Sequence, residues 1–80
     1  MTKLESLESR RKIAFESFVY FYKQARYWHQ KSCDAVASGF VTAAENMFDK
    51  GHTCFLRAKK ENQKLREIEE QIEAASRLQN

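Results

Sequence analysis

The sequence predicts an all-α protein, an antiparallel helical hairpin with a long first helix and coiled-coil-like packing. Three observations support this prediction. The 80-residue chain contains no proline, the residue that most strongly interrupts a helix. Its apolar residues keep one helical phase from Phe15 to Phe48, on a wheel of about 100° per residue. A group of residues typical of a helix end then surrounds Gly51.

The first predicted helix begins near Leu4, because Thr2 and Glu5 have the spacing of a capping box. It continues through the aromatic-rich segment of residues 15–30. The retained apolar phase favours one continuous helix to about Asp49, since two helices joined by a turn have no reason to share a phase.

A break in this helix is the alternative. Ser32 or Asp34 could cap a new helix, and Gly39 costs about 1 kcal/mol relative to alanine in a helix interior. A helix broken between Ser32 and Asp34 would give a three-helix bundle. Both interpretations remain open at this point.

The last predicted helix covers residues 54–78, with Gly51 just after the preceding helix and Thr53 as its N-cap. Its apolar residues follow a heptad pattern, interrupted by Glu61, which predicts a short coiled-coil seam. The seam residues are Ala58, Leu65, Ile68, Ile72 and Ala75.

A turn at Gly51 would pair residues whose numbers sum to roughly 102, so residues before about Lys23 would have no antiparallel neighbour. The most apolar part of the chain would then be exposed, which is unfavourable in water. Either the first helix folds back, or a second chain covers this surface, most simply in a symmetric dimer. The predicted self-interface or partner-binding residues are Phe15, Phe18, Val19, Phe21, Tyr22 and Trp28.

Basic residues are concentrated at the start of the last helix. The chain as a whole is only weakly basic, with a net charge of +3, so nucleic acid is not the default partner. The local cluster nevertheless gives an alternative prediction of a phosphate-contacting surface, against the simpler interpretation of a solvated helix face. Its members are Arg57, Lys59, Lys60, Lys64 and Arg66.

Histidine and cysteine occur in two pairs, His29 with Cys33 and His52 with Cys54. Intervening helix would separate Cys33 from His52 by about 25 Å or more, so one four-ligand zinc site is not expected. A Cys–His nucleophile lacks a third orienting group and an oxyanion hole. We therefore predict no catalytic residue, no metal and no cofactor.

The 80 residues fit a single helical domain without a membrane span. Two cysteines without a signal peptide predict buried, reduced thiols in a cytoplasmic protein. The predicted function is a non-enzymatic accessory protein, of the kind found in bacteria or phages, that binds and modulates a partner protein as a homodimer. The alternative is a nucleic-acid-binding helical dimer that uses the basic face of the last helix.

Overall fold

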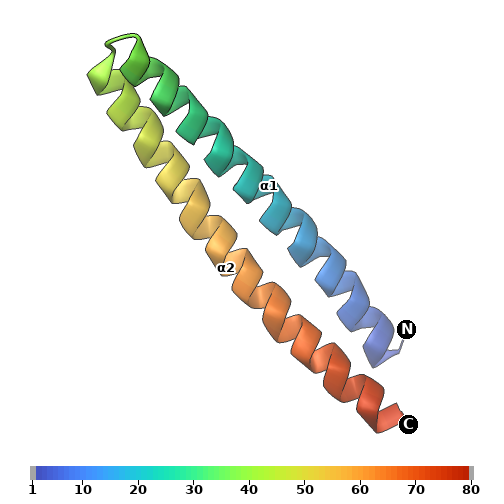
Figure 1. The fold of residues 1–80 in the computed structure, drawn as a ribbon. Coiled ribbons are helices and arrows are strands. Elements are labelled where there is room, and N and C mark those ends of the chain that lie inside the picture. Colours follow the sequence, from blue (N-terminus) through green and yellow to red (C-terminus); the bar gives the residue numbers. More distant parts are fainter. Residues whose placement is uncertain (1, 80) are drawn as a thin grey trace.

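The computed structural model describes residues 2–79, which form two long helices side by side. Helix α1 spans Lys3–Ala37 and helix α2 spans Val41–Gln79. They run antiparallel, so both termini lie at the same end of a rod of 61 × 16 × 13 Å (Figure 1). The predicted all-α helical hairpin is confirmed.

Helix α1 begins as predicted. The Thr2 side chain accepts a hydrogen bond from the Glu5 amide at 3.1 Å, so Thr2 is the N-cap. The helix then continues through Ser32 and Asp34 to Ala37. The predicted break between these two residues, and the three-helix bundle that depends on it, are therefore wrong.

The chain reverses around Gly39, which has a φ of 83°. The Phe40 amide donates to the Ala35 carbonyl at 2.8 Å, and the Gly39 amide donates to the Val36 carbonyl at 3.0 Å. These two bonds define a Schellman motif, in which the residue with positive φ is most often glycine. The prediction that the first helix reaches Asp49 and ends at Gly51 is wrong, because Gly39 already ends it.

Gly51 lies inside α2 and is buried against α1. A Cβ atom added there would lie 3.2 Å from the Cβ of Trp28 and 3.4 Å from the Ala25 carbonyl oxygen. Glycine is thus explained by the close approach of the two helices. Thr53 is not an N-cap, since its hydroxyl donates within the helix to the Asp49 carbonyl at 3.0 Å.

The two helices meet along a seam of residues spaced alternately by three and four, as in a coiled coil. Many of these residues are small, which allows the helix axes to lie close together. The Ser32 hydroxyl crosses the seam and donates to the Ala44 carbonyl at 3.0 Å. The buried or half-buried seam residues are Leu7, Ala14, Phe18, Phe21, Ala25, Trp28, Ser32 and Ala35 on α1, and Ala44, Met47, Gly51, Cys54, Ala58, Glu61, Leu65, Ile68 and Ile72 on α2.

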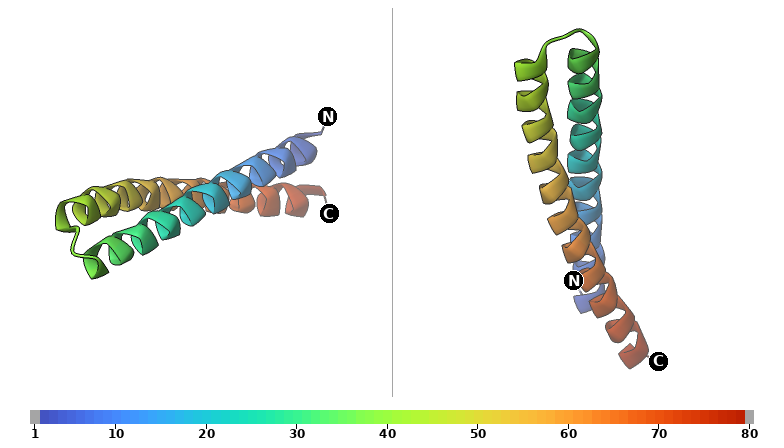
Figure 2. Two further views of the ribbon diagram at one scale, coloured as in Figure 1. Left: turned by 90° about the horizontal axis from the view of Figure 1, so that it is seen from above. Right: turned by 60° about the vertical axis from the view of Figure 1, so that its left-hand side comes forward.

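With the turn at Gly39, residues at the same level of the hairpin have numbers that sum to about 79, as Trp28 and Gly51 do. The two helices therefore remain neighbours along their whole length and cross at a shallow angle (Figure 2). Near the termini, Ala14 packs with Leu65 and Ile68 in the hydrophobic core. The predicted lack of an antiparallel neighbour before Lys23 is wrong.

Candidate protein-interaction faces

The seam divides the predicted interface residues into two groups. Phe15, Val19 and Tyr22 lie to one side of it on α1. Phe18, Phe21 and Trp28 are half-buried seam residues, so they contribute to the packing of the hairpin itself. Phe18 nevertheless reaches toward the first group, with its ring 5.9 Å from that of Tyr22.

The side of the hairpin that carries Phe15 and Tyr22 is apolar. On α1 the residues Phe15, Tyr22, His29 and Val36 recur every seventh position, and on α2 the residues Val41, Phe48 and Phe55 do the same. Seven-residue spacing keeps each row on one side of a supercoiled helix pair. We call this surface the apolar face; its large side chains are Phe15, Val19, Tyr22, Val36, Phe40, Val41, Phe48 and Phe55.

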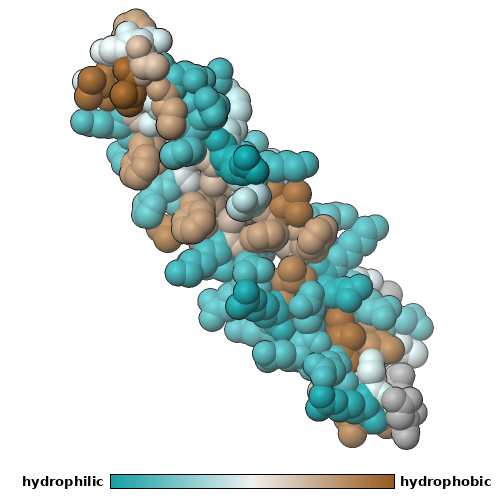
Figure 3. Space-filling model, in the orientation of Figure 1, coloured by the Kyte–Doolittle hydropathy of each residue, from teal (hydrophilic) through white to brown (hydrophobic). Residues whose placement is uncertain are grey.

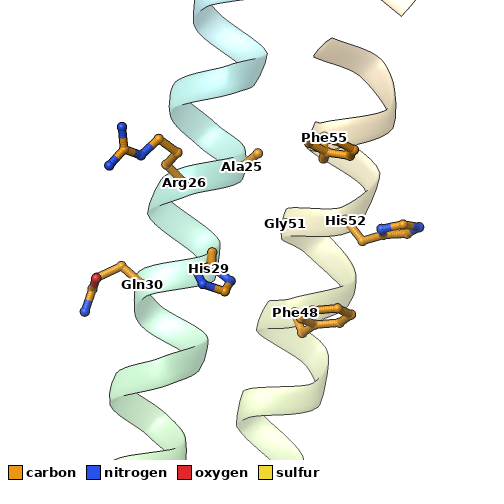
Figure 4. Close-up of a pocket in the computed structure, with 8 residues that line it drawn as sticks. All are labelled: Ala25, Arg26, His29, Gln30, Phe48, Gly51, His52 and Phe55. Carbon is orange, nitrogen blue, oxygen red and sulfur yellow. The ribbon is translucent and has the colours of Figure 1, made fainter. Parts of the chain in front are cut away.

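A shallow hollow at the centre of the apolar face joins the two rows (Figure 4). His29 of α1 points toward α2, where Phe48 and Phe55 project on either side of it. The His52 ring stacks on the Phe48 ring, with centroids 6.3 Å apart. The floor of the hollow is formed by Ala25 and Gly51, two residues too small to fill the space between the aromatic rings.

Seven side chains of the apolar face are exposed over 44% to 66% of their surface. If each of the five aromatic ones leaves roughly 100 Å² accessible, they alone expose about 500 Å². This is at the upper end of the largest apolar patch on a typical monomer, about 300–600 Å². Figure 3 shows such hydrophobic surface near the turn and along the middle of the rod.

The opposite side of the hairpin combines aromatic and basic side chains. On α2, Lys50 and Arg57 stand one position before a seam residue, whereas Phe48 and Phe55 stand one position after one. The two pairs therefore lie on opposite sides of the seam. Lys50 lies 4.7 Å from the centroid of the Trp28 ring, and Arg57 lies 5.2 Å from that of Phe21. We call this surface the aromatic–basic face; it comprises Phe21, Tyr27, Trp28, Lys31, Lys50 and Arg57.

Four of the five residues of the predicted basic cluster line two adjoining hollows: Arg57, Lys59 and Lys60 line one, and Arg57, Lys60 and Lys64 line the other. Arg57 and Lys64 lie 3.8 and 3.7 Å from the carboxylate of Glu61, a buried seam residue. Lys60 lines the same hollow as these three residues. Heptad spacing places the helix positions of Lys59 and Arg66 in line with His52, on the side of the apolar face. The Lys59 side chain nevertheless lines the hollow of Arg57 and Lys60. Four of the five cations therefore surround these hollows, with the carboxylate of Glu61 among them, and Arg66 lies apart.

The histidine and cysteine residues also separate. His29 Nε2 lies 3.8 Å from the Cys33 sulfur on an exposed surface. The prediction of buried thiols is wrong for Cys33, which is exposed, while Cys54 is half-buried in the seam. Within residues 2–79, no group of three or more His, Cys, Asp or Glu residues has the geometry to hold a metal ion.

The sequence interpretation missed Phe48, Phe55 and Val41 as interface candidates. These three residues are spaced seven positions apart, which indicates one row beside the α2 seam. The row could be recognised only once the turn at Gly39 placed all three on the same helix. Neither helix, over the residues described, contains a segment long and apolar enough to cross a bilayer. Searches against protein-family models, curated proteins and solved structures gave no match to this chain.

Proposed function

We propose that this chain is a non-enzymatic helical protein that binds and modulates a partner protein and works as a homodimer in the cytoplasm. One observation carries the proposal: the apolar face exposes seven large hydrophobic side chains on a rod of only two helices. Exposed apolar surface of this extent is typical of protein–protein contact sites.

The thin core of the hairpin supports association. Most of its buried hydrophobic residues are alanines, and no large side chain among the described residues is fully buried. Chains of this size bury a small fraction of their surface and commonly gain stability from oligomerisation. A second copy on the apolar face would bury the aromatic rings that the seam leaves exposed.

The aromatic–basic face supports a separate partner-binding role. Tyr, Trp and Arg are the residue types most enriched at binding hot spots, and here Tyr27, Trp28 and Arg57 lie on one side. Stacking of Lys50 on Trp28 and of Lys31 on Tyr27 orders these side chains before binding. The expected partner is a protein with acidic residues around an apolar anchor.

Light scattering over a range of concentrations tests the homodimer. We expect twice the 9.4 kDa chain mass, and loss of the dimer in Phe48→Asp. Tyr20→Asp is the matched control, because Tyr20 is an equally exposed aromatic residue that lies outside the apolar face. A mass of one chain at every concentration would contradict the proposal.

Partner binding is tested by comparing proteins captured by two variants of the purified protein. The double variant Tyr27→Ala, Lys50→Glu removes central groups of the aromatic–basic face, whereas Arg10→Glu changes one exposed charge near the N-terminus. We expect a captured protein to be lost with the first and retained with the second. Equal capture by both variants would exclude this face as the binding site.

Nucleic-acid binding remains the second candidate, supported by the proximity of Arg57, Lys60 and Lys64. If three phosphates are contacted, affinity for double-stranded DNA should fall with a log–log salt slope of about −3. Lys60→Glu with Lys64→Glu should then abolish binding in a fluorescence-anisotropy titration. Unchanged affinity would exclude this surface.

A further inference from the structure

We propose that two copies associate through their apolar faces as an antiparallel four-helix bundle with the turns at opposite ends. In this arrangement α1 packs on the partner's α1, and α2 packs on the partner's α2. The inference rests on the proposed homodimer and adds to it the orientation of the copies, the position of the two-fold axis and the ion pairs that select this orientation.

The extent of the apolar face locates the two-fold axis. On the α1 side it runs from Phe15 to Val36 and ends with Phe40 in the turn, and the α1 row continues toward the N-terminus with Glu8. On α2 the corresponding row continues beyond Phe55 with Asn62 and Glu69. The face therefore occupies the turn-proximal part of the rod, over about 37 Å at 1.5 Å per residue. Its midpoint lies between Tyr27 and Trp28 on α1, at the level of His52 on α2, and His52 lines the hollow at the centre of the face.

An antiparallel dimer centred at this level brings apolar side chains into register. On α1 the facing residues have numbers that sum to about 55, so Val19 meets the partner's Val36, and Phe15 lies opposite the partner's turn, which carries Phe40. On α2 the sum is about 103, so Phe48 meets the partner's Phe55. Rings on either side of the hollow would thus fill the corresponding hollow of the other copy.

The area is sufficient for a stable dimer. The aromatic side chains supply about 500 Å² per copy, and the valines and the aliphatic parts of neighbouring side chains raise this to roughly 700 Å². A standard interface buries about 800 Å² per partner. Toward the termini the rows continue with the polar residues Glu8, Asn62 and Glu69. Those parts of the two rods therefore lie outside the interface.

Charge selects the antiparallel orientation. Heptad spacing places Glu45 and Lys59 in the α2 row of His52, at the edge of the apolar face, and neither forms an ion pair within the described residues of the hairpin. The Lys59 side chain lines the hollow of Thr53, so in the dimer it has to turn toward the partner. The numbers of Glu45 and Lys59 sum to about 104, so the antiparallel dimer places Glu45 beside the partner's Lys59 twice. In the alternative dimer, both turns lie at the same end and α1 faces the partner's α2. Lys59 would then meet the partner's Val19 and Glu45 the partner's Cys33, so neither charge would be paired. Complementary charges of this kind fix orientation.

Disulfide trapping tests the orientation. In a Cys33→Ser, Cys54→Ser background, His52→Cys places one thiol next to the two-fold axis, where the two sulfur atoms can meet. We expect a disulfide-linked dimer under mild oxidation. Thr53→Cys is the matched control, because Thr53 lines hollows on the opposite side of α2, and it should remain unlinked.

The outcomes separate the orientation from the dimer itself. Light scattering that shows a dimer, with no link through His52→Cys or with equal linking through Thr53→Cys, would overturn the antiparallel arrangement and leave the homodimer intact. A monomer by light scattering would overturn both. Selective linking through His52→Cys in a dimer supports the proposal.

A charge exchange gives an independent test by sedimentation equilibrium. We expect Lys59→Glu and Glu45→Lys each to raise the dimer Kd about tenfold, because each change affects both symmetry-related pairs. The double variant should return to within about threefold of the parent Kd. Lys60→Glu, a charge reversal that lies on the opposite side, should leave the Kd unchanged. A double variant no tighter than the single ones would overturn the proposed pairing.

Discussion

Gly51 offers the strictest test of how closely the helices approach each other. A Cβ added at Gly51 would lie 3.2 Å from the Trp28 Cβ, closer than most such contacts, and 3.4 Å from the Ala25 carbonyl oxygen, an ordinary van der Waals distance. The obstacles are a backbone atom and the base of a side chain, which cannot rotate away. Alanine at this position therefore requires a shift of a few tenths of an ångström, whereas a side chain larger than alanine has to push α1 and α2 apart.

Two opposing effects determine how much a substitution at Gly51 changes the free energy of unfolding. Replacing a helical glycine gains about 1 kcal/mol of helix propensity. Overpacking a close contact costs about 1–3 kcal/mol. For Gly51→Ala these effects nearly cancel, and we expect a free energy of unfolding within about 1 kcal/mol of the parent. For Gly51→Leu the overpacking cost is at the upper end, which leaves a net loss of about 2 kcal/mol and lowers Tm by about 10 °C.

The assay is thermal unfolding followed by circular dichroism at one protein concentration, since association couples Tm to concentration. Ala43→Leu is the control, because it adds the same bulk at an exposed position of α2 and should change Tm by less than about 3 °C. A Gly51→Leu variant as stable as the parent would refute the close approach.

Three further substitutions test individual features of the hairpin. Gly39→Ala should cost about 1 kcal/mol in urea unfolding, because alanine is strained at a φ of 83°, and Gly39→Asn should cost less; equal stability of all three would contradict the left-handed turn. Ser32→Ala should cost about 1 kcal/mol by removing the buried hydrogen bond to the Ala44 carbonyl, whereas Ser6→Ala should be neutral. Glu61→Leu should raise Tm by several degrees, because leucine restores the apolar seam position; a lower Tm would show that the ion pairs of Glu61 outweigh its burial.

The sequence allowed the helix content and the hairpin class to be predicted because they depend on local properties. The absence of proline and the capping box at Thr2 act within a few residues, and both predictions agree with the structure. The last helix was also assigned to the correct seam from Ala58 onward. Its three-four spacing depends only on which residues of one helix are apolar.

The turn could not be placed because the apolar stripe is wider than the seam. Residues such as Cys33, Val36 and Phe40 belong to the apolar face, while Ala44 and Met47 belong to the seam of the next helix. Together they imitate one continuous phase across the turn. Gly39 followed by an apolar residue was a local signal of a Schellman end, and it competed with Gly51, whose glycine serves close packing.

The error in the turn also determined which interface residues could be predicted. Placing the reversal at Gly51 made Phe18 and Phe21 appear unpaired, although α2 covers them in the structure. The exposed residues Phe48 and Phe55 were assigned no partner role. Phe48 was counted in the apolar stripe of the first predicted helix, and Phe55 lay at the start of the last one, so the two were not recognised as one row. The interface residues were therefore mispredicted because the misplaced turn paired the wrong residues of the two helices. The types of residue expected at an interface did not cause this error.

The seam itself explains why this hairpin has surfaces suited to binding. Seven of the seventeen seam residues are alanine, glycine or serine, which brings the helices close together. Most of the large aromatic residues then lie on the two sides of the seam. On one side their rings meet basic side chains in cation–π contacts, and on the other they remain exposed. Exchanging the small seam residues for leucine would stabilise wider spacing of the helices and would change both faces at once. Close packing between the helices and the capacity to bind other chains are thus two consequences of the same pattern of residues.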